Sequence, residues 1–238
     1  MSPLADSPLA LAAGLGWLAP LLALGALLAA APAQAREISL PLPDLQGRVP
    51  LEQVLNARRT QREFSARGLS LAQLGQLAWA AYGVTATRQG LGLKTVPSAG
   101  ARYPLDIYLV VGEQAVAGVE AGCYRYLPAS HSLAVVKPGD QRQALAGASW
   151  RQMWMAQAPL SLVIAAQYRR CTERYGNRGV MYTHMEAGHA AQNIFLQAEA
   201  LGLKAGIVGA FDNPLLSQAL GLPEDHEPLL AMPVGYTR

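Results

Sequence analysis

The sequence has few cysteines and few charged side chains. It contains two cysteines among 238 residues, and charged residues make up 15% of the chain. Two cysteines exclude a metal site built from several thiolates. Cys123 and Cys171 lie far apart in the sequence, so a disulfide between them is one interpretation and two buried thiols are the plainer one.

Several familiar motifs are missing as well. No Gly-x-Gly-x-x-Gly follows an expected strand, no phosphate loop ends in Gly-Lys-Ser/Thr, and no Gly-x-Ser-x-Gly nucleophile elbow occurs. His184 and His189 are five residues apart, so they do not share a helix face as two metal ligands would. We therefore expect no metal site.

The chain also lacks a basic block with interleaved aromatic residues. Its formal net charge is +3, and the basic residues are scattered along the sequence. Such a mild excess favours anionic ligands in general and does not indicate binding to nucleic acid.

The N-terminal segment is apolar. Residues 9–31 consist of Ala, Leu, Gly, Trp and Pro, and the run ends in Ala33-Gln34-Ala35, a pattern typical of signal-peptide cleavage sites. No Lys or Arg precedes the run, which is also long enough to remain as a membrane anchor. We expect residues 1–35 to be a signal peptide or anchor, and the protein to be exported, either periplasmic or anchored facing the periplasm.

The remainder of the chain predicts one domain of the α+β class. Residues 36–48 contain two prolines and a glycine and are expected to be an extended linker, followed by a single domain over residues 49–238. Ser70 and Gly83 are suitable ends for a helix over 71–82, and Thr183 with Glu186 matches a capping box that would open a helix to about Leu201. The other expected helices are 50–59, 140–148, 151–158 and 213–221; the expected strands are 106–111, 122–126, 133–136, 160–166, 205–211 and 229–235. This order predicts a mostly antiparallel sheet surrounded by helices.

Four segments suit a planar ligand that carries a phosphate. The segment 58–62, Arg-Arg-Thr-Gln-Arg, offers guanidinium groups and a hydroxyl to phosphate oxygens. The segment 96–104 places small residues between two prolines, where a flat ring could approach the backbone. Residues 186–193 give a helix face with little bulk, and residues 206–212 give a strand with glycines. Each has a plain structural alternative, such as solvated arginines at a helix end or Glu186 as the partner of a helix cap.

Together these segments resemble the nitroreductase-like flavoprotein superfamily, in particular its SagB-type branch, the thiazoline/oxazoline dehydrogenases. The resemblance covers roughly residues 51–235. Its motifs are Arg-Arg-Thr-x-Arg-x-Phe (58–64), Pro-Ser-Ala-Gly-Ala-Arg-Tyr-Pro (97–104), Arg-Tyr-Gly-Asn-Arg-Gly (174–179), Glu-Ala-Gly-His-x-x-Gln-Asn (186–193) and Pro-Val-Gly-Tyr (233–236). It implies an FMN-dependent oxidoreductase that acts on a small organic substrate, with non-covalent FMN at the interface of a homodimer.

The resemblance also implies roles for single residues. The phosphate and ribityl chain of FMN would be held by Arg58, Arg59, Thr60, Arg62 and, at the chain end, Arg238. The flavin ring would be lined by Pro97, Ser98 and Ala99 of the partner subunit. Gln192 and Asn193 would lie near the ring or the ribityl chain, and Gly209 and Ala210 would present backbone near the reactive edge of the ring. Tyr182 would be the catalytic residue, relaying the proton that accompanies the hydride, with packing at a helix entrance as its alternative.

The reaction itself is left open by the sequence. Azoline-oxidising members of the family share a Lys-Tyr pair that handles substrate protons, and the nearest dipeptide here is Arg174-Tyr175. Dehydrogenation of a heterocycle therefore competes with reduction of a nitro or quinone compound. A flavin-binding dimer without turnover is the alternative outside enzymes.

Overall fold

The computed structural model describes residues 37–237. The expected signal peptide or anchor, residues 1–35, and the expected phosphate ligand Arg238 lie outside these residues. Within residues 37–237, no helix is both long and apolar enough to span a membrane.

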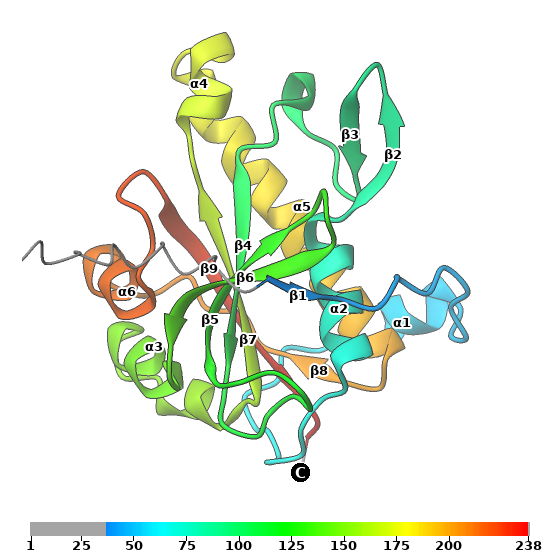
Figure 1. The fold of residues 1–238 in the computed structure, drawn as a ribbon, viewed down its shortest axis with the longest axis vertical. Helices are drawn as coiled ribbons and strands as arrows, with labels where there is room; N and C mark the ends of the chain where they lie inside the picture. Colours follow the sequence, from blue (N-terminus) through cyan, green and yellow to red (C-terminus); the bar gives the residue numbers. More distant parts are fainter. Residues whose placement is uncertain (1–36, 238) are drawn as a thin grey trace, which may run out of the picture. The chain divides into compact units, whose positions relative to one another are not determined.

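An antiparallel sheet runs through the described part of the chain (Figure 1). It has seven strands in the order β1-β6-β5-β4-β7-β9-β8, and every neighbouring pair is antiparallel. The strands are β1 (Glu37–Ser39), β4 (Leu105–Val111), β5 (Gly122–Leu127), β6 (Ser132–Pro138), β7 (Leu160–Ala166), β8 (Lys204–Ala205) and β9 (Glu227–Gly235). The predicted α+β class with a mostly antiparallel sheet is confirmed.

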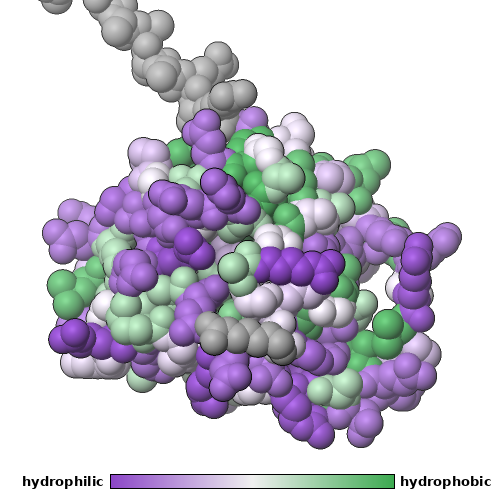
Figure 2. Space-filling view, turned by 90° about the horizontal axis from the view of Figure 1, so that it is seen from below, coloured by the Kyte–Doolittle hydropathy of each residue, from purple (hydrophilic) through white to green (hydrophobic). Residues whose placement is uncertain are grey.

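Helices cover both faces of this sheet (Figure 1). Alternate residues of β4 point to opposite faces: Ile107 enters the larger core beneath α2 and α5, while Tyr108 enters a second core beneath α3 and α6. The helices are α1 (Leu51–Ala57), α2 (Leu71–Tyr82), α3 (Arg142–Ala148), α4 (Arg169–Tyr175), α5 (Arg178–Ala200) and α6 (Asn213–Leu220), with short 3-10 helices η1 (Ala99–Ala101) and η2 (Met153–Gln157). Figure 2 shows a face on which hydrophilic side chains predominate and apolar ones form smaller groups between them.

Several predicted elements are confirmed together with the interactions that end them. The hydroxyl of Ser70 accepts a hydrogen bond from the Gln73 amide, and the Gln73 side chain accepts one from the Ser70 amide, so α2 begins with a complete capping box. Gly221 adopts φ 71° directly after α6, a left-handed conformation that glycine adopts without steric cost. Both thiols, Cys123 and Cys171, are buried and free, which confirms the plainer of the two cysteine interpretations.

Other predicted elements are wrong. The helix expected at 183–201 begins at Arg178, because the Thr183 hydroxyl donates to the Gly179 carbonyl at 2.8 Å instead of capping. The strand expected at 205–211 shrinks to β8 and one bridge between Val208 and Ala231. Glycines weaken a strand here, and Pro233 on the facing β9 has no N–H to donate.

Two features near the chain's N-terminal side were not predicted. A two-stranded hairpin, β2 (Val84–Arg88) and β3 (Leu91–Lys94), follows α2. In the segment expected to be a linker, β1 pairs with β6 and Leu40 is buried. The sheet thus begins within the segment that the sequence marks only as extended.

Candidate functional site

The long helix α5 organises the candidate site. Its buried face includes the small residues Gly179, Ala187 and Ala190, which allow close packing against its neighbours. Its first half borders a small pocket, and its second half reaches the arginines that follow α1. Residues 186 and 195, which mark these two regions, are roughly 13 Å apart along the axis at 1.5 Å per residue.

The small pocket has a volume of about 260 Å³. It lies between the first half of α5 and the loop after β3, and its lining residues are Pro97, Ser98, Ala99, Tyr182, Met185, Glu186 and His189. The structure therefore brings together four of the predicted site residues, three from the loop and Tyr182 from the helix. We refer to it as the Glu186 pocket.

A glycine shapes the loop side of the Glu186 pocket. Gly100 has φ 56°, and a Cβ added there would come within 2.4 Å of the Tyr175 hydroxyl. Glycine adopts this conformation without steric cost and leaves room for the Tyr175 hydroxyl. The pair Arg174-Tyr175 is thus placed beside the Pro97–Ala99 loop.

Tyr182 contacts two neighbours at the pocket. Its ring lies edge-on to Tyr175, with centroids 5.3 Å apart, and the Arg178 guanidinium lies 5.6 Å from its ring centroid. The expectation that Tyr182 stands at a helix entrance is wrong, because α5 begins at Arg178. Its catalytic role stays a prediction.

Glu186 is the polar group at the buried side of the pocket, with 2% of its surface exposed. The expectation that it partners a helix cap is wrong: its carboxylate accepts a hydrogen bond from the Tyr82 hydroxyl at 2.6 Å. That hydroxyl in turn accepts one from the Leu105 amide at 3.1 Å. Burial raises the pKa of Glu186, while hydrogen bonds from Ser98 and Tyr82 and the nearby charge of Lys94 lower it in part.

Lys94 packs against the ring of Tyr82. Its Nζ is 3.7 Å from the centroid of the Tyr82 ring and 4.8 Å from that of Tyr103. Among residues 37–237, no carboxylate forms an ion pair with it. Burial lowers the pKa of Lys94 to about 8.

Three of these residues form one network that the sequence did not predict: Tyr82, Lys94 and Glu186. A signal existed for Glu186, since helical periodicity places it on the buried stripe with Thr183 and Ala190. Tyr82 and Lys94 lie at the ends of a helix and a short strand, where the sequence pattern carries no comparable signal.

The arginine segment, residues 58–62, follows α1. The guanidinium of Arg58 lies 5.2 Å from the Phe195 ring centroid, and that of Arg62 lies 5.9 Å from the Trp154 ring centroid. Arg59 is exposed and donates to the carbonyls of Asn56 and Arg58 at 2.9 and 2.7 Å. In the described residues, none of these three guanidinium groups forms an ion pair with a carboxylate.

The structure places the predicted glycine segment beside these arginines. Thr60 forms a parallel bridge with Ala205, and the Gln61 amide donates to the Ala205 carbonyl at 2.9 Å. A Cβ on the next residue, Gly206, would come within 2.6 Å of the Gln61 carbonyl oxygen, so this contact requires glycine. Gly209 and Ala210 follow and are exposed.

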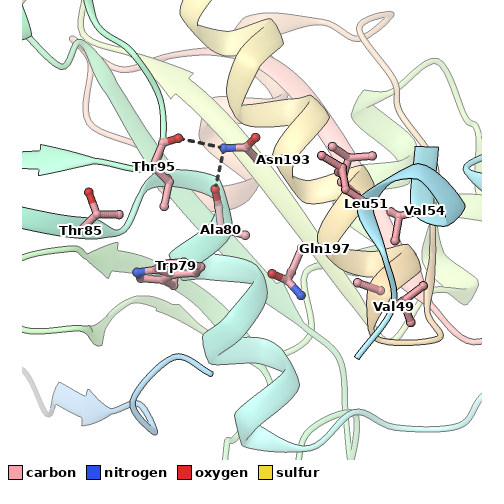
Figure 3. A pocket seen from close by; sticks show the side chains of 11 residues that line it. Val49, Leu51, Val54, Trp79, Ala80, Thr85, Thr95, Asn193 and Gln197 are labelled. Atoms are coloured by element: carbon pink, nitrogen blue, oxygen red, sulfur yellow. Dashed lines mark hydrogen bonds between the residues drawn. The ribbon is translucent and has the colours of Figure 1, made fainter. Parts of the chain in front are cut away.

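The two predicted amides on α5 have different surroundings. Gln192 is exposed. The Asn193 side chain donates to the carbonyls of Ala80 and Thr95 at 3.1 and 3.3 Å, and so ties α5 to the end of α2 and to the segment after β3 (Figure 3). Asn193 also lines an apolar hollow of about 470 Å³ between α1, α2 and α5. Its amide is thus satisfied within the chain, which gives it a structural role.

Comparisons with known proteins agree with this architecture. The family model described as the nitroreductase family matches residues 55–236. The protein MJ1384 of Methanocaldococcus jannaschii, whose name assigns it to the nitroreductases, is 46% identical over 198 residues, which cover 83% of this chain and 96% of that protein. The chain therefore belongs to the nitroreductase family, a family of oxidoreductases.

Two further matches concern the fold and a more distant relative. A crystal structure from Ralstonia eutropha JMP134, described as a nitroreductase, superposes with a TM-score of 0.74 at 32% identity and covers 85% of this chain and 90% of that chain. The microcin B17-processing protein McbC of Escherichia coli is 26% identical over 133 residues, which cover 54% of this chain and 48% of that protein.

The residues present fit FMN. The three guanidinium groups without ion-pair partners match the charge of a phosphate, and the small exposed residues Gly209 and Ala210 leave backbone accessible to a ring. The Glu186 pocket offers the flat, small-residue surface of Pro97–Ala99. Among residues 37–237, no three His, Cys, Asp or Glu side chains come together in a way that could hold a metal.

Proposed function

We propose that the protein is an FMN-dependent oxidoreductase that works as a homodimer on a small organic substrate. The observation that carries this proposal is that the guanidinium groups of Arg58, Arg59 and Arg62 form no ion pair within residues 37–237 and lie beside the glycine-containing backbone that follows Ala205. These arginines and the Thr60 hydroxyl would hold the phosphate and ribityl chain. When bound, FMN supplies hydride transfer, and the chain supplies its position and surroundings.

The two parts of the proposed site border different halves of α5, which supports a dimer. A two-fold axis that sets two α5 helices antiparallel would bring the Glu186 pocket of one subunit to the arginine segment of the other. Such a partner would also cover the apolar hollow between α1, α2 and α5, together with Leu51 and Leu55, which are exposed on α1. Pro97, Ser98 and Ala99 would then reach the flavin ring from the partner subunit.

Reduction of a nitro or quinone compound is the direction that the site supports better. The chain has no recognisable counterpart of the Lys-Tyr pair of azoline-oxidising relatives; the nearest dipeptide is Arg174-Tyr175, and Tyr182 is another candidate for the tyrosine. A guanidinium stays protonated in proteins, so Arg174 cannot accept a substrate proton as a lysine amine can. Dehydrogenation of a heterocycle remains the second candidate, favoured by the likeness to McbC.

We also propose export, with residues 1–35 as a signal peptide or anchor. The mass and N-terminal sequence of protein recovered from the periplasmic and membrane fractions of expressing cells test this proposal. Full-length chain in the cytoplasmic fraction alone would contradict it.

The function is tested on the purified protein. We expect one FMN per subunit, released on denaturation and identified by its mass, and a dimeric mass in solution. Flavin reduced photochemically without air should be reoxidised by a benzoquinone or nitroaromatic compound. Denatured protein without flavin, together with apo-protein that does not quench added FMN, would contradict the proposal. A monomer that retains full flavin would contradict only its dimeric part.

A further inference from the structure

The Glu186 pocket contains a carboxyl group whose surroundings suit proton transfer. Glu186 is almost fully buried, yet it borders a cavity of about 260 Å³ together with Ser98, Tyr182 and His189. Its only close partners in the described residues are the neutral hydroxyls of Tyr82 and Ser98. A buried carboxyl without a neighbouring guanidinium or ion pair favours the protonated form at higher pH than usual.

We propose that Glu186 is the group that passes a proton to the substrate in this pocket, and that Tyr82 and Lys94 are positioning residues behind it. The inference rests on the proposed function and deepens it. The Tyr82 hydroxyl fixes one carboxyl oxygen, and the Lys94 amine lies 3.7 Å from the centroid of the Tyr82 ring. Glu186 is therefore held from within the protein, and it also lines the cavity.

The neighbours of Glu186 come from four other elements. The α2 residue Tyr82 and the loop residue Ser98 donate hydrogen bonds, and Lys94 on β3 is the nearest cation that acts on it. Cys171 on α4 interacts with it electrostatically as a neutral thiol. On α5 itself, Tyr182 and His189 share the pocket lining. Lys94 thus favours the charged form of Glu186, while burial opposes it.

The proposed step balances for a quinone substrate. Bound FMN, when reduced, would supply a hydride, hence two electrons, which would convert the quinone into a hydroquinone monoanion. The O–H bond of Glu186 then breaks, its proton bonds to the anionic oxygen, and the neutral hydroquinone leaves. Glu186 remains as a carboxylate and regains a proton from solvent at the open side of the pocket, where His189 is exposed.

The first test uses flavin-free protein. Carbon-13 labelling of glutamate carboxyls allows their titration by NMR, and the signal absent from Glu186→Gln identifies Glu186. We expect its pKa to lie above that of the other glutamates, and to rise further in Tyr82→Phe, which removes a hydrogen bond to the carboxylate. A Glu186 signal that titrates with the exposed glutamates would overturn the proposal.

The second test uses the flavin-loaded dimer after anaerobic photoreduction. We expect Glu186→Gln to slow reoxidation by benzoquinone by roughly a hundredfold, as for a lost general acid, with unchanged flavin content. The wild-type rate should fall as pH rises through the NMR pKa of Glu186, and that dependence should vanish in the variant. Glu199→Gln, on the same helix but paired with Lys204, is the matched control and should reoxidise at the wild-type rate.

Other outcomes separate this inference from the proposed function. If Glu186→Gln retains FMN and reoxidises at the wild-type rate, the role of Glu186 is wrong while the flavoenzyme stands. A larger loss in Tyr182→Phe than in Glu186→Gln would instead assign the proton to Tyr182. If wild-type protein retains no flavin at all, the proposed function fails, and the proton-transfer role fails with it.

Discussion

Two buried carboxylates of this protein have opposite surroundings. Asp106, on β4, lies 2.6 Å from an Nη of Arg125 and 2.8 Å from one of Arg170, with His226 Nε2 at 3.6 Å. Within the described residues, Glu186 on α5 has only hydroxyl groups as hydrogen-bond partners, those of Tyr82 and Ser98. The nearby Lys94 contacts the Tyr82 ring and forms no ion pair with Glu186. We call the first set, Asp106 with Arg125, Arg170 and His226, the paired cluster.

The same contrast holds for the cations. Arg125 and Arg170 each have a carboxylate partner, whereas Arg58, Arg59 and Arg62 have none in the described residues. Desolvated charge is unfavourable unless it is compensated, so the paired cluster satisfies its charges within the chain. A charged side chain that has no ion-pair partner and lies near a cavity or an accessible stretch of backbone is a candidate for binding a ligand or a proton of opposite charge. The comparison therefore contrasts charges that are paired within the described residues with charges that remain available to a ligand or a proton.

Breaking the paired cluster should give the largest loss of stability. Asp106→Asn leaves two guanidinium groups close together without their anion, and we expect the free energy of unfolding to fall by about 3 kcal/mol, since the arginines are partly exposed. Urea denaturation measures this change. Glu173→Gln, which breaks exposed pairs, should cost less than about 1 kcal/mol. Equal losses in the two variants would contradict the contrast.

Removing an unpaired arginine should act on the ligand instead of the fold. Arg58→Ala and Arg62→Ala should each weaken FMN binding by roughly 1.5–3 kcal/mol, the range of a lost charge-assisted hydrogen bond. Fluorescence quenching of FMN by apo-protein measures the affinity, and urea denaturation of the apo-protein should change little. The exposed Arg169, paired with Glu173, provides the control Arg169→Ala, for which we expect unchanged FMN affinity. Lower stability with unchanged FMN affinity would assign Arg58 and Arg62 to packing against Phe195 and Trp154.

The fold could be predicted from the sequence where a local signal and the final packing agree. Ser70 and Gly83 mark both ends of α2, and the apolar run 160–166 becomes β7, an interior strand. The start of α5 was wrong because Thr-x-x-Glu is also what a buried helix face shows when a threonine donates to the preceding turn. Local sequence cannot distinguish these two arrangements, since both contain Thr183 and Glu186 at the same three-residue spacing.

The candidate site was predictable only in part. Small residues and arginines that contact a ligand form short motifs, so segments 58–62 and 97–99 could be found along the chain. The network of Tyr82, Lys94 and Glu186 comes from three elements that meet only in the folded protein. Asn193 is predicted to lie near the flavin ring or ribityl chain, and in the structure its side-chain amide also joins α5 to Ala80 and Thr95. A motif residue can therefore have structural contacts as well, while Tyr82 and Lys94, which no motif marks, belong to the network of Glu186.

The smallest expected effect is the contribution of Lys94 to the pH dependence of the free energy of unfolding. It decides whether Lys94 is a buried charge without an ion-pair partner. Its pKa is about 8 in the folded protein, against an ordinary value of 10.5. Between these values the unfolded chain binds more protons than the folded one, so this lysine makes stability rise with pH. From pH 8 to 9 the gain should be about 1 kcal/mol, somewhat below the limit of 1.36 kcal/mol per pH unit. Lys94→Met removes the gain, and Lys94→Arg should remove it too because a guanidinium keeps its proton.

Urea denaturation at a series of pH values tests this sign. The difference in unfolding free energy between wild type and Lys94→Met should grow in favour of wild type from pH 8 to 9.5. The raised pKa of Tyr82 acts in the opposite direction at higher pH, since the unfolded tyrosine then loses its proton first, but both proteins contain Tyr82 and the difference cancels it. Parallel curves would mean that the folded protein leaves Lys94 solvated. Lys94 could then not help to set the charge of Glu186. The contrast with the paired cluster would then rest on Glu186 and the three arginines, without Lys94.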